Sequence, residues 1–219
     1  MRLGILGGTF NPIHIGHLRI AEEIREELEL KKVCIVPVSL PPHKDTKPVT
    51  SFHHRSAMIR LATKNTPALE TLDLEGRRQG LSYSIETLRE IHQLSRTDID
   101  LFFILGLDAF KDIKTWREYK LLFDYSHFVV IKRPGIHFKD PEQFLDSLEV
   151  KFKREGQGTS FIGPSGNILI FKEATQIDIS STRIRDMVAA GKSIHFLVPE
   201  PVRTYIIEKG LYKAHENAR

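Results

Sequence analysis

Near its N-terminus the chain contains the segment Gly7-Gly8-Thr9-Phe10-Asn11-Pro12-Ile13-His14-Ile15-Gly16-His17. This segment follows an apolar run at residues 3–6, which is typical of a short buried strand. Apolar residues at spacings of three and four then indicate one face of an amphipathic helix. The two glycines and both histidines therefore lie in a predicted strand-to-helix connection. The double glycine allows the backbone to turn tightly and to approach a ligand closely.

His14 and His17 suit a phosphate-binding role. A helix N-terminus offers free N–H groups and the positive end of the helix dipole, which favour an anion. The two histidines are three residues apart, so they point the same way if the turn is helical. Two imidazoles at that position can donate hydrogen bonds to charge that develops on phosphorus. The alternative is a turn with incidental polar residues, because a lone short motif often misleads.

Apolar runs alternate with segments of helical period along most of the chain. Strands are predicted at 2–7, 33–38, 69–73, 100–106, 127–132 and 167–172, and helices near 18–30, 53–65, 84–95 and 141–153. This repetition predicts an α/β protein: a Rossmann-like, doubly wound, mainly parallel sheet with helices on both faces. Ligands of such sheets bind beyond the carboxyl ends of the strands. Residues 156–166, rich in Gly and Ser, are predicted to form a mobile loop.

The composition is that of an ordinary globular protein of 219 residues, and we expect one domain over 1–219 with a C-terminal helical portion at about 180–212. The net charge of +4 permits anionic substrates and does not require nucleic acid. No apolar run approaches membrane-spanning length, and the N-terminus lacks a signal-peptide layout. The single cysteine, Cys34, fits a reducing cytosol. We expect a cytoplasmic protein that binds neither nucleic acid nor a membrane.

A second informative segment is Ile179-Ser180-Ser181-Thr182-Arg183-Ile184-Arg185. Ser180 or Ser181 is predicted to cap a helix that runs to about residue 190. Two arginines in its first turn oppose the helix dipole, which is explained if a multiply charged anion binds there. The alternative is two exposed arginines on a tolerant surface, since each costs under about 1 kcal/mol.

The first segment resembles the GGTFDPxHxGH signature of the nicotinate-nucleotide adenylyltransferases, within the HxGH nucleotidyltransferases, and the second resembles their ISSTxIR. The resemblance covers nearly the whole chain. It implies transfer of the adenylyl group of ATP to nicotinate mononucleotide, which gives deamido-NAD and pyrophosphate in NAD biosynthesis. It also implies Mg²⁺, held mainly by ATP and water. Asn11 stands where the family usually has Asp, which removes a charge.

The resemblance assigns catalysis to His14 and His17. It implies ATP contacts for these two histidines and for Gly8, Thr9, Phe10, Gly106, Asp108, Ser181, Thr182 and Arg185. Asp108 ends a GxD motif after strand 100–106, where its carboxylate can accept from ribose hydroxyls or lie near Mg²⁺. A helix N-cap is an equally good and compatible role for Asp108.

The resemblance implies that the mononucleotide binds to Lys44, Thr87, Trp116 and Arg133. Thr87 would bond the pyridine carboxylate, and a hydroxyl at a helix start suits the acid better than an uncharged amide. Trp116 would stack on the pyridine ring, with a packing anchor as the alternative. Lys44 and Arg133 would bind phosphate, and the alternative for each is a solvated surface residue. Ser84 is predicted to cap the helix that carries Thr87.

Three rival functions stay open. A sibling nucleotidyltransferase would use nicotinamide mononucleotide or another phosphorylated acceptor. An amino-acid-activating enzyme shares the HIGH signature that residues 14–17 spell, but its lysine-rich second signature is missing here. A nucleotide-sensing module would bind without turnover. The sequence leaves assembly into homo-oligomers open.

Overall fold

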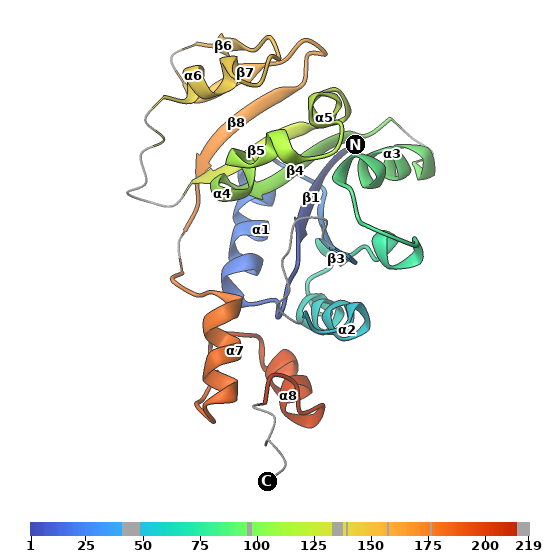
Figure 1. Cartoon of the computed structure of the whole chain (residues 1–219), viewed down its shortest axis with the longest axis vertical. Helices are drawn as coiled ribbons and strands as arrows, with labels where there is room; N and C mark the ends of the chain where they lie inside the picture. The colour runs from blue at the N-terminus through green and yellow to red at the C-terminus, as the bar shows by residue number, and fades with distance from the viewer. Residues whose placement is uncertain are drawn as a thin grey trace.

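A mixed eight-stranded sheet forms the centre of the protein, in the order β3-β2-β1-β4-β5-β8-β7-β6 (Figure 1). The computed structural model describes residues 1–40, 49–95, 98–132, 138, 140–156, 158–175 and 177–213. The strands from β3 to β8 in this order are parallel, whereas β7 and β6 continue the sheet antiparallel. The strand bounds are β1 (Arg2–Gly8), β2 (Lys32–Pro37), β3 (Leu69–Thr71), β4 (Asp100–Gly106), β5 (His127–Lys132), β6 (Lys153–Glu155), β7 (Ser160–Ile162) and β8 (Ile168–Glu173).

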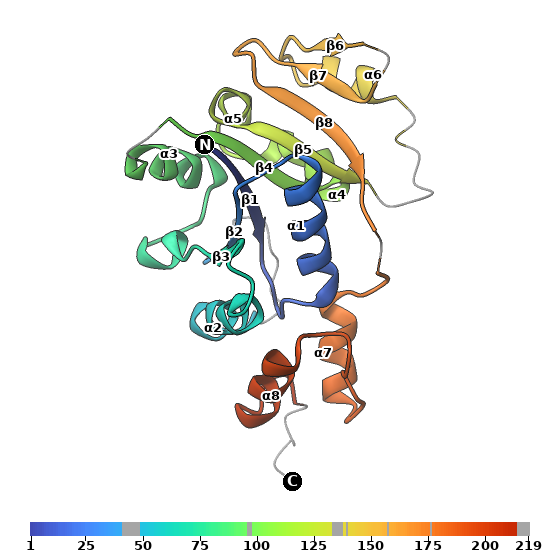
Figure 2. The ribbon, with the colours of Figure 1, turned by 180° about the vertical axis from the view of Figure 1, so that it is seen from behind.

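Helices cover both faces of the sheet, as the two opposite views show (Figures 1 and 2). One face packs against α1 (Ile15–Glu27), α2 (Phe52–Thr63), α7 (Ser181–Ala189) and α8 (Glu200–Glu208). The other packs against α3 (Ser84–Leu94), α4 (Leu107–Lys111), α5 (Tyr119–Tyr125) and α6 (Pro141–Asp146), with short 3-10 turns η1 (Leu74–Arg77) and η2 (Ile113–Thr115). Among the described helices, none is long and apolar enough to cross a membrane.

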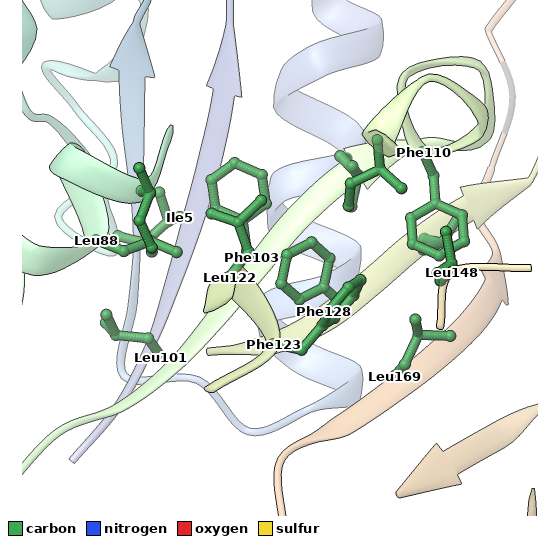
Figure 3. Packing of buried hydrophobic residues seen from close by; sticks show 14 of the residues in the cluster. Ile5, Leu88, Leu101, Phe103, Phe110, Leu122, Phe123, Phe128, Leu148 and Leu169 are labelled. Atoms are coloured by element: carbon green, nitrogen blue, oxygen red, sulfur yellow. The ribbon is translucent and has the colours of Figure 1, made fainter. Parts of the chain in front are cut away.

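The hydrophobic core is divided into two clusters, one on each face of the sheet, because side chains along each strand point to the two faces in turn. Phe103 joins the cluster under α3 to α6, which also holds Phe128 and Leu122 (Figure 3). Its neighbour Phe102 joins the cluster under α1, α2, α7 and α8. Successive side chains of a strand point to opposite faces, so a run of consecutive apolar residues supplies both clusters. The predicted doubly wound α/β fold is confirmed.

The predicted and observed elements differ in several places. All six predicted strands are present, but the helix predicted over 141–153 ends at Asp146 as α6. Residues 153–155 instead form β6, which pairs with β7 inside the segment predicted to be a mobile loop. Phe161 of β7 is 3 % exposed, and its burial explains why a Gly- and Ser-rich segment is a strand. The predicted cap Ser84 is wrong, because Tyr83 is the N-cap of α3 and Ser84 its first residue.

The strand order places a crevice beside β1. From β1 the chain proceeds outward through β2 and β3 on one side, and then returns to β4 and β5 on the other. In open α/β sheets, ligands bind at the carboxyl ends of the strands where the order reverses in this way. Here those ends are Gly8 of β1 and Gly106 of β4, and α1 and α4 begin just beyond them.

Candidate active site

A cavity of about 990 Å³ opens at this edge of the sheet. Its lining combines the end of β1, the end of β4, the first turn of α3 and the segment before α7. This volume is at the upper end of the range for small-molecule and cofactor sites. The predicted site residues on its wall are Gly8, Thr9, Phe10, His14, His17, Thr87, Gly106, Asp108, Trp116 and Ser181.

The two histidines lie against each other on the cavity wall. Their rings stack with centroids 3.6 Å apart and planes inclined by 23°. The backbone N–H of His14 donates to Nδ1 of His17 over 3.3 Å. Because Nδ1 of His17 accepts, the neutral ring carries its proton on Nε2, which is then the donor. Nδ1 of His14 is buried and has no hydrogen-bond partner among the described residues.

Burial keeps both rings uncharged. His14 is 6 % exposed, and this desolvation lowers its pKa to about 4. Burial also lowers the pKa of His17 well below its usual value, and the neighbouring His14 lowers it further. Both imidazoles are therefore neutral at pH 7 in the free protein, and they can donate hydrogen bonds without holding a charge.

Phe10 and Gly16 set the positions of the two rings. Phe10 is 3 % exposed, and its ring meets His17 edge-on at 5.0 Å and 81°. Its φ of 47° is rare for a bulky residue and is held by this burial. A Cβ at Gly16 would lie 3.2 Å from Cε1 and Nδ1 of His14, so a larger residue there would press on that ring. The aromatic side chain of Phe10 thus supports His17 from within the core.

The start of α7 is joined directly to the loop before α1. The Ser181 hydroxyl donates to the carbonyl oxygen of Pro12 over 2.8 Å, and Arg185 Nη1 donates to that of Asn11 over 2.8 Å. Arg185 Nη2 also donates to the Thr182 hydroxyl at 3.2 Å. A guanidinium has several N–H donors, so Arg185 keeps capacity for an anion. The fold therefore brings together the two segments singled out in the sequence.

Ser180 caps α7, since its hydroxyl accepts from the backbone N–H of Arg183 at 3.2 Å. This confirms one of the two predicted caps.

Arg55 of α2 is a buried residue that the sequence reasoning missed. It is 1 % exposed and donates to four carbonyl oxygens at 2.7–3.1 Å, those of Thr9, Val38, Ser39 and Thr50. Burial lowers the pKa of its guanidinium. The available signal was its spacing of three and four from the buried Met58 and Ile59, which places an arginine on the apolar face of α2.

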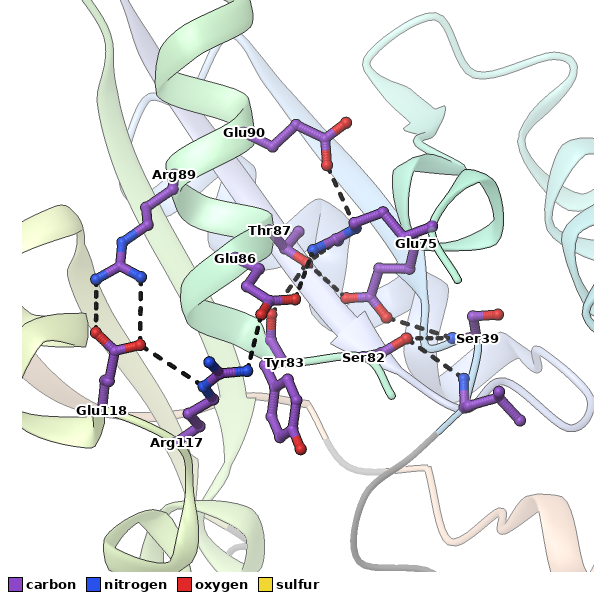
Figure 4. Close-up of polar contacts among 12 residues, drawn as sticks. Ser39, Glu75, Ser82, Tyr83, Glu86, Thr87, Arg89, Glu90, Arg117 and Glu118 are labelled. Atoms are coloured by element: carbon purple, nitrogen blue, oxygen red, sulfur yellow. Dashed lines mark hydrogen bonds and ion pairs between the residues drawn. The ribbon is translucent and has the colours of Figure 1, made fainter. Parts of the chain in front are cut away.

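Thr87 lies in the opposite wall within a charged network (Figure 4). It is 2 % exposed, its hydroxyl donates to Glu75 Oε1 at 2.8 Å, and Arg78 Nη2 donates to the same hydroxyl oxygen at 2.6 Å. Glu75 Oε2 also accepts from the backbone N–H of Ser39 at 3.3 Å. Sequence reasoning missed Glu75, a buried carboxylate that joins the exit of β2 to the first turn of α3.

Trp116 completes this wall. It is half-buried, and its ring meets Phe103 edge-on at 6.1 Å and 83°. Beside it, the Arg117 guanidinium lies 4.8 Å from the centroid of the Tyr83 ring, and its Nη1 donates to Glu86 Oε1 at 3.1 Å (Figure 4). Arg117 therefore packs on the cavity wall as a cation over an aromatic face. Trp116 has one side packed in the core and still lines the cavity.

Three further predicted site residues are Asp108, Lys44 and Arg133. Asp108 lies in the first turn of α4, and the N-cap of that helix is Gly106, so the N-cap role considered for Asp108 is wrong. Lys44 and Arg133 lie outside the described residues. The described residues contain no group of three or more His, Cys, Asp or Glu side chains that could hold a metal ion.

The likeness to known proteins agrees with this geometry. The cytidylyltransferase-like family matches residues 5–187. A protein of Syntrophotalea carbinolica, named probable nicotinate-nucleotide adenylyltransferase, is 42 % identical over the full length of both chains. One of the same name from Desulfatibacillum aliphaticivorans is 44 % identical and covers 97 % of this chain and 100 % of its own. This chain belongs to the nicotinate-nucleotide adenylyltransferase family.

Solved structures support the same fold. The Plasmodium falciparum nicotinic acid mononucleotide adenylyltransferase complexed with NaAD superposes with a TM-score of 0.71 at 22 % identity, over 96 % of this chain and 97 % of that one. The same protein complexed with APC gives a TM-score of 0.68. These solved structures share the fold of this chain, and the full-length relatives confirm the resemblance inferred from residues 7–17 and 179–185.

Proposed function

We propose that this protein transfers the adenylyl group of ATP to the phosphate of nicotinate mononucleotide, forming deamido-NAD and releasing pyrophosphate. The observation that carries the proposal is the single cavity shared by the histidine pair, the start of α7 and the Thr87–Trp116 wall. An oxygen of the mononucleotide phosphate bonds to the α-phosphorus of ATP, while the bond from that phosphorus to the bridging oxygen breaks. The electron pair leaves with pyrophosphate, so no covalent intermediate with the protein is required.

The first task of the protein is to neutralise the charge that two phosphorylated substrates bring together. We assign His14 and His17 to oxygens of the α- and β-phosphates, where the Nε2–H of a neutral ring can donate to charge that grows in the transition state. Gly8, Thr9 and Phe10 place the backbone of the same loop beside the nucleotide, and Gly106 and Asp108 serve the nucleoside side at the end of β4.

The outer phosphates belong, in this proposal, to the N-terminus of α7. Thr182 and Arg185 would contact them, and the helix dipole favours an anion there. Ser181 would hold the loop through Pro12, as it does in the free protein. Mg²⁺ would accompany ATP, bound by phosphate oxygens and water. When bound, it would offset negative charge on the phosphates.

On the acceptor side, we propose that Trp116 stacks on the pyridine ring and that Thr87 bonds its carboxylate. To donate to that carboxylate, the Thr87 hydroxyl would turn its proton away from Glu75 Oε1, to which it donates in the free protein. The charge of Arg78, whose Nη2 is 2.6 Å from the Thr87 hydroxyl oxygen, is balanced by the neighbouring carboxylates of Glu75, Glu86 and Glu90. The backbone N–H groups at the start of α3 therefore carry the expected preference for the acid over the amide. Lys44 and Arg133 are proposed as phosphate contacts on their resemblance to the family. The whole of 1–219 would act as one domain, and the free buried thiol of Cys34 suits the cytoplasm.

Pyrophosphate release from ATP tests the function. The purified protein is incubated with nicotinate mononucleotide, with nicotinamide mononucleotide or with no acceptor, and the dinucleotide product is identified by mass. We expect rapid release with the acid, slower release with the amide and none without acceptor. Faster turnover of the amide would favour the sibling enzyme. Nucleotide binding without pyrophosphate release would favour a sensing module.

A further inference from the structure

Tyr212 connects the C-terminal part of the chain to the loop that precedes the histidines. Its hydroxyl donates to Oδ1 of Asn11 over 2.9 Å, between residues 201 positions apart. Asn11 is 5 % exposed, so this bond forms away from bulk water. Tyr212 has a φ of 62°, a left-handed conformation that is rare outside glycine and persists where the surroundings fix it.

The bond is one of a set of hydrogen bonds from other elements to oxygen atoms of this loop. Arg55 Nη1 donates to the carbonyl oxygen of Thr9, Arg185 Nη1 to that of Asn11, and the Ser181 hydroxyl to that of Pro12, each over 2.8 Å. Oxygen atoms would repel a phosphate, so a loop whose acceptors bond to protein donors is prepared for an anion. Tyr212 is the one member of this set that bonds to a side chain of the loop.

The hydrogen bond between Tyr212 and Asn11 is expected to persist over the working pH range. Burial raises the pKa of Tyr212 to about 12, so its phenol remains a donor at any working pH. Because that donor occupies Oδ1, Asn11 acts here as an acceptor. Aspartate, the usual residue of the family, would offer an oxygen at the same place. The loss of charge at Asn11 therefore leaves the link to Tyr212 intact.

We propose that Tyr212 is a positioning residue for adenylyl transfer, which sets the loop before His14 and His17 through its bond to Asn11. The inference rests on the proposed function. It gives the segment after α8 an indirect part, through Asn11, in the geometry of the proposed phosphate site. Removal of the hydroxyl should let the loop shift relative to the triphosphate, and small misplacements of reacting groups reduce turnover strongly.

A matched pair of variants tests this. Tyr212→Phe removes the hydroxyl that bonds to Asn11, and Tyr205→Phe removes one that lies 2.9 Å from His54 Nδ1 on α2. Both tyrosines are half-buried, and each variant loses one oxygen. We expect kcat to fall about tenfold in Tyr212→Phe with KM for ATP nearly unchanged, since the hydroxyl orients the loop and does not touch ATP. Tyr205→Phe should keep kcat within about twofold of the wild-type protein. Equal kcat in the two variants would overturn the proposal.

Two further experiments distinguish a failure of the positioning role from a failure of the proposed function. Asn11→Asp keeps an acceptor oxygen, so it should stay sensitive to Tyr212→Phe, whereas Asn11→Ala should be insensitive to it. The second arm records NMR shifts of the His14 and His17 rings without substrates. They should move in Tyr212→Phe and stay in place in Tyr205→Phe. A wild-type protein that releases no pyrophosphate would refute the proposed function, while unmoved ring shifts in Tyr212→Phe would refute the positioning role.

Discussion

The backbone N–H of His14 donates to Nδ1 of His17 over 3.3 Å, so one histidine decides which nitrogen of the other is a donor. We predict that His17→Ala lowers kcat about 10²-fold or more, because it removes a donor aimed at transition-state charge. Steady-state pyrophosphate release measures this. His53→Ala, which removes an exposed ring on α2, is the control and should keep kcat. A His17→Ala protein that turns over like the control contradicts the assignment.

Trp116→Ala is predicted to raise KM for the mononucleotide more than KM for ATP. The indole lines the cavity beside Thr87, on the wall assigned to the pyridine ring. Aromatic stacking contributes about 0.5–1.5 kcal/mol beyond area burial, so a several-fold change is expected. Initial rates with each substrate varied in turn measure the two constants, and Trp116→Phe should recover most of the loss. An equal rise in both KM values would argue against stacking.

The buried neutral state of His14 predicts an acid-sensitive stability. Its pKa is near 4 in the folded protein and 6.5 when unfolded, so between these values the unfolded state binds more protons. Stability from this group is present above pH 6.5 and is lost as the pH falls towards 4. The full effect is on the order of 3 kcal/mol.

Urea unfolding of the wild-type protein and of His14→Asn at pH 7, 5.5 and 4 tests this dependence. Carboxylates titrate alike in both proteins, so the difference between their unfolding free energies reports the ionisation of His14 together with its effect on His17. That difference should shrink as the pH falls. A constant difference would mean that His14 ionises as easily in the folded as in the unfolded protein.

Arg55→Met should destabilise the fold by about 2–4 kcal/mol, because it leaves buried carbonyl oxygens without a donor. Arg60→Met is the matched control: Arg60 lies on the same helix, and its side chain is 51 % exposed. The control should change the free energy of unfolding by about 0.5 kcal/mol or less. Thermal and urea unfolding measure both. Similar losses in the two variants would show that the four carbonyl contacts of Arg55 add little.

The sequence was most informative where a physical requirement repeats along the chain. Buried parallel strands need continuous apolar runs, so all six predicted strands occur. The two segments that meet beside the cavity could also be singled out, since glycines, histidines and hydroxyls at helix starts have a local chemical meaning. The β6–β7 hairpin was missed because one buried residue, Phe161, has no periodicity to reveal it.

Most of the features that the sequence did not reveal depend on polar contacts between residues far apart in the chain. Glu75 bonds to the backbone of Ser39, 36 positions away, and Arg55 to that of Thr9, 46 positions away. Any carboxylate or guanidinium could make such a bond, and its neighbours in sequence do not indicate the partner. Of these two residues, only Arg55 has a signal in the sequence, because it is a charged residue on the apolar face of its helix. The contacts that orient the site are therefore visible only in the folded chain.

The bond from Ser181 to Pro12 spans 169 positions, and this distance has a consequence during synthesis. The loop with the histidines is synthesised well before the residues of α7 that donate hydrogen bonds to it. A nascent chain that ends near residue 175 holds every strand of the sheet and still lacks the donors of Ser181 and Arg185. The loop can thus reach its observed geometry only after α7 has been synthesised.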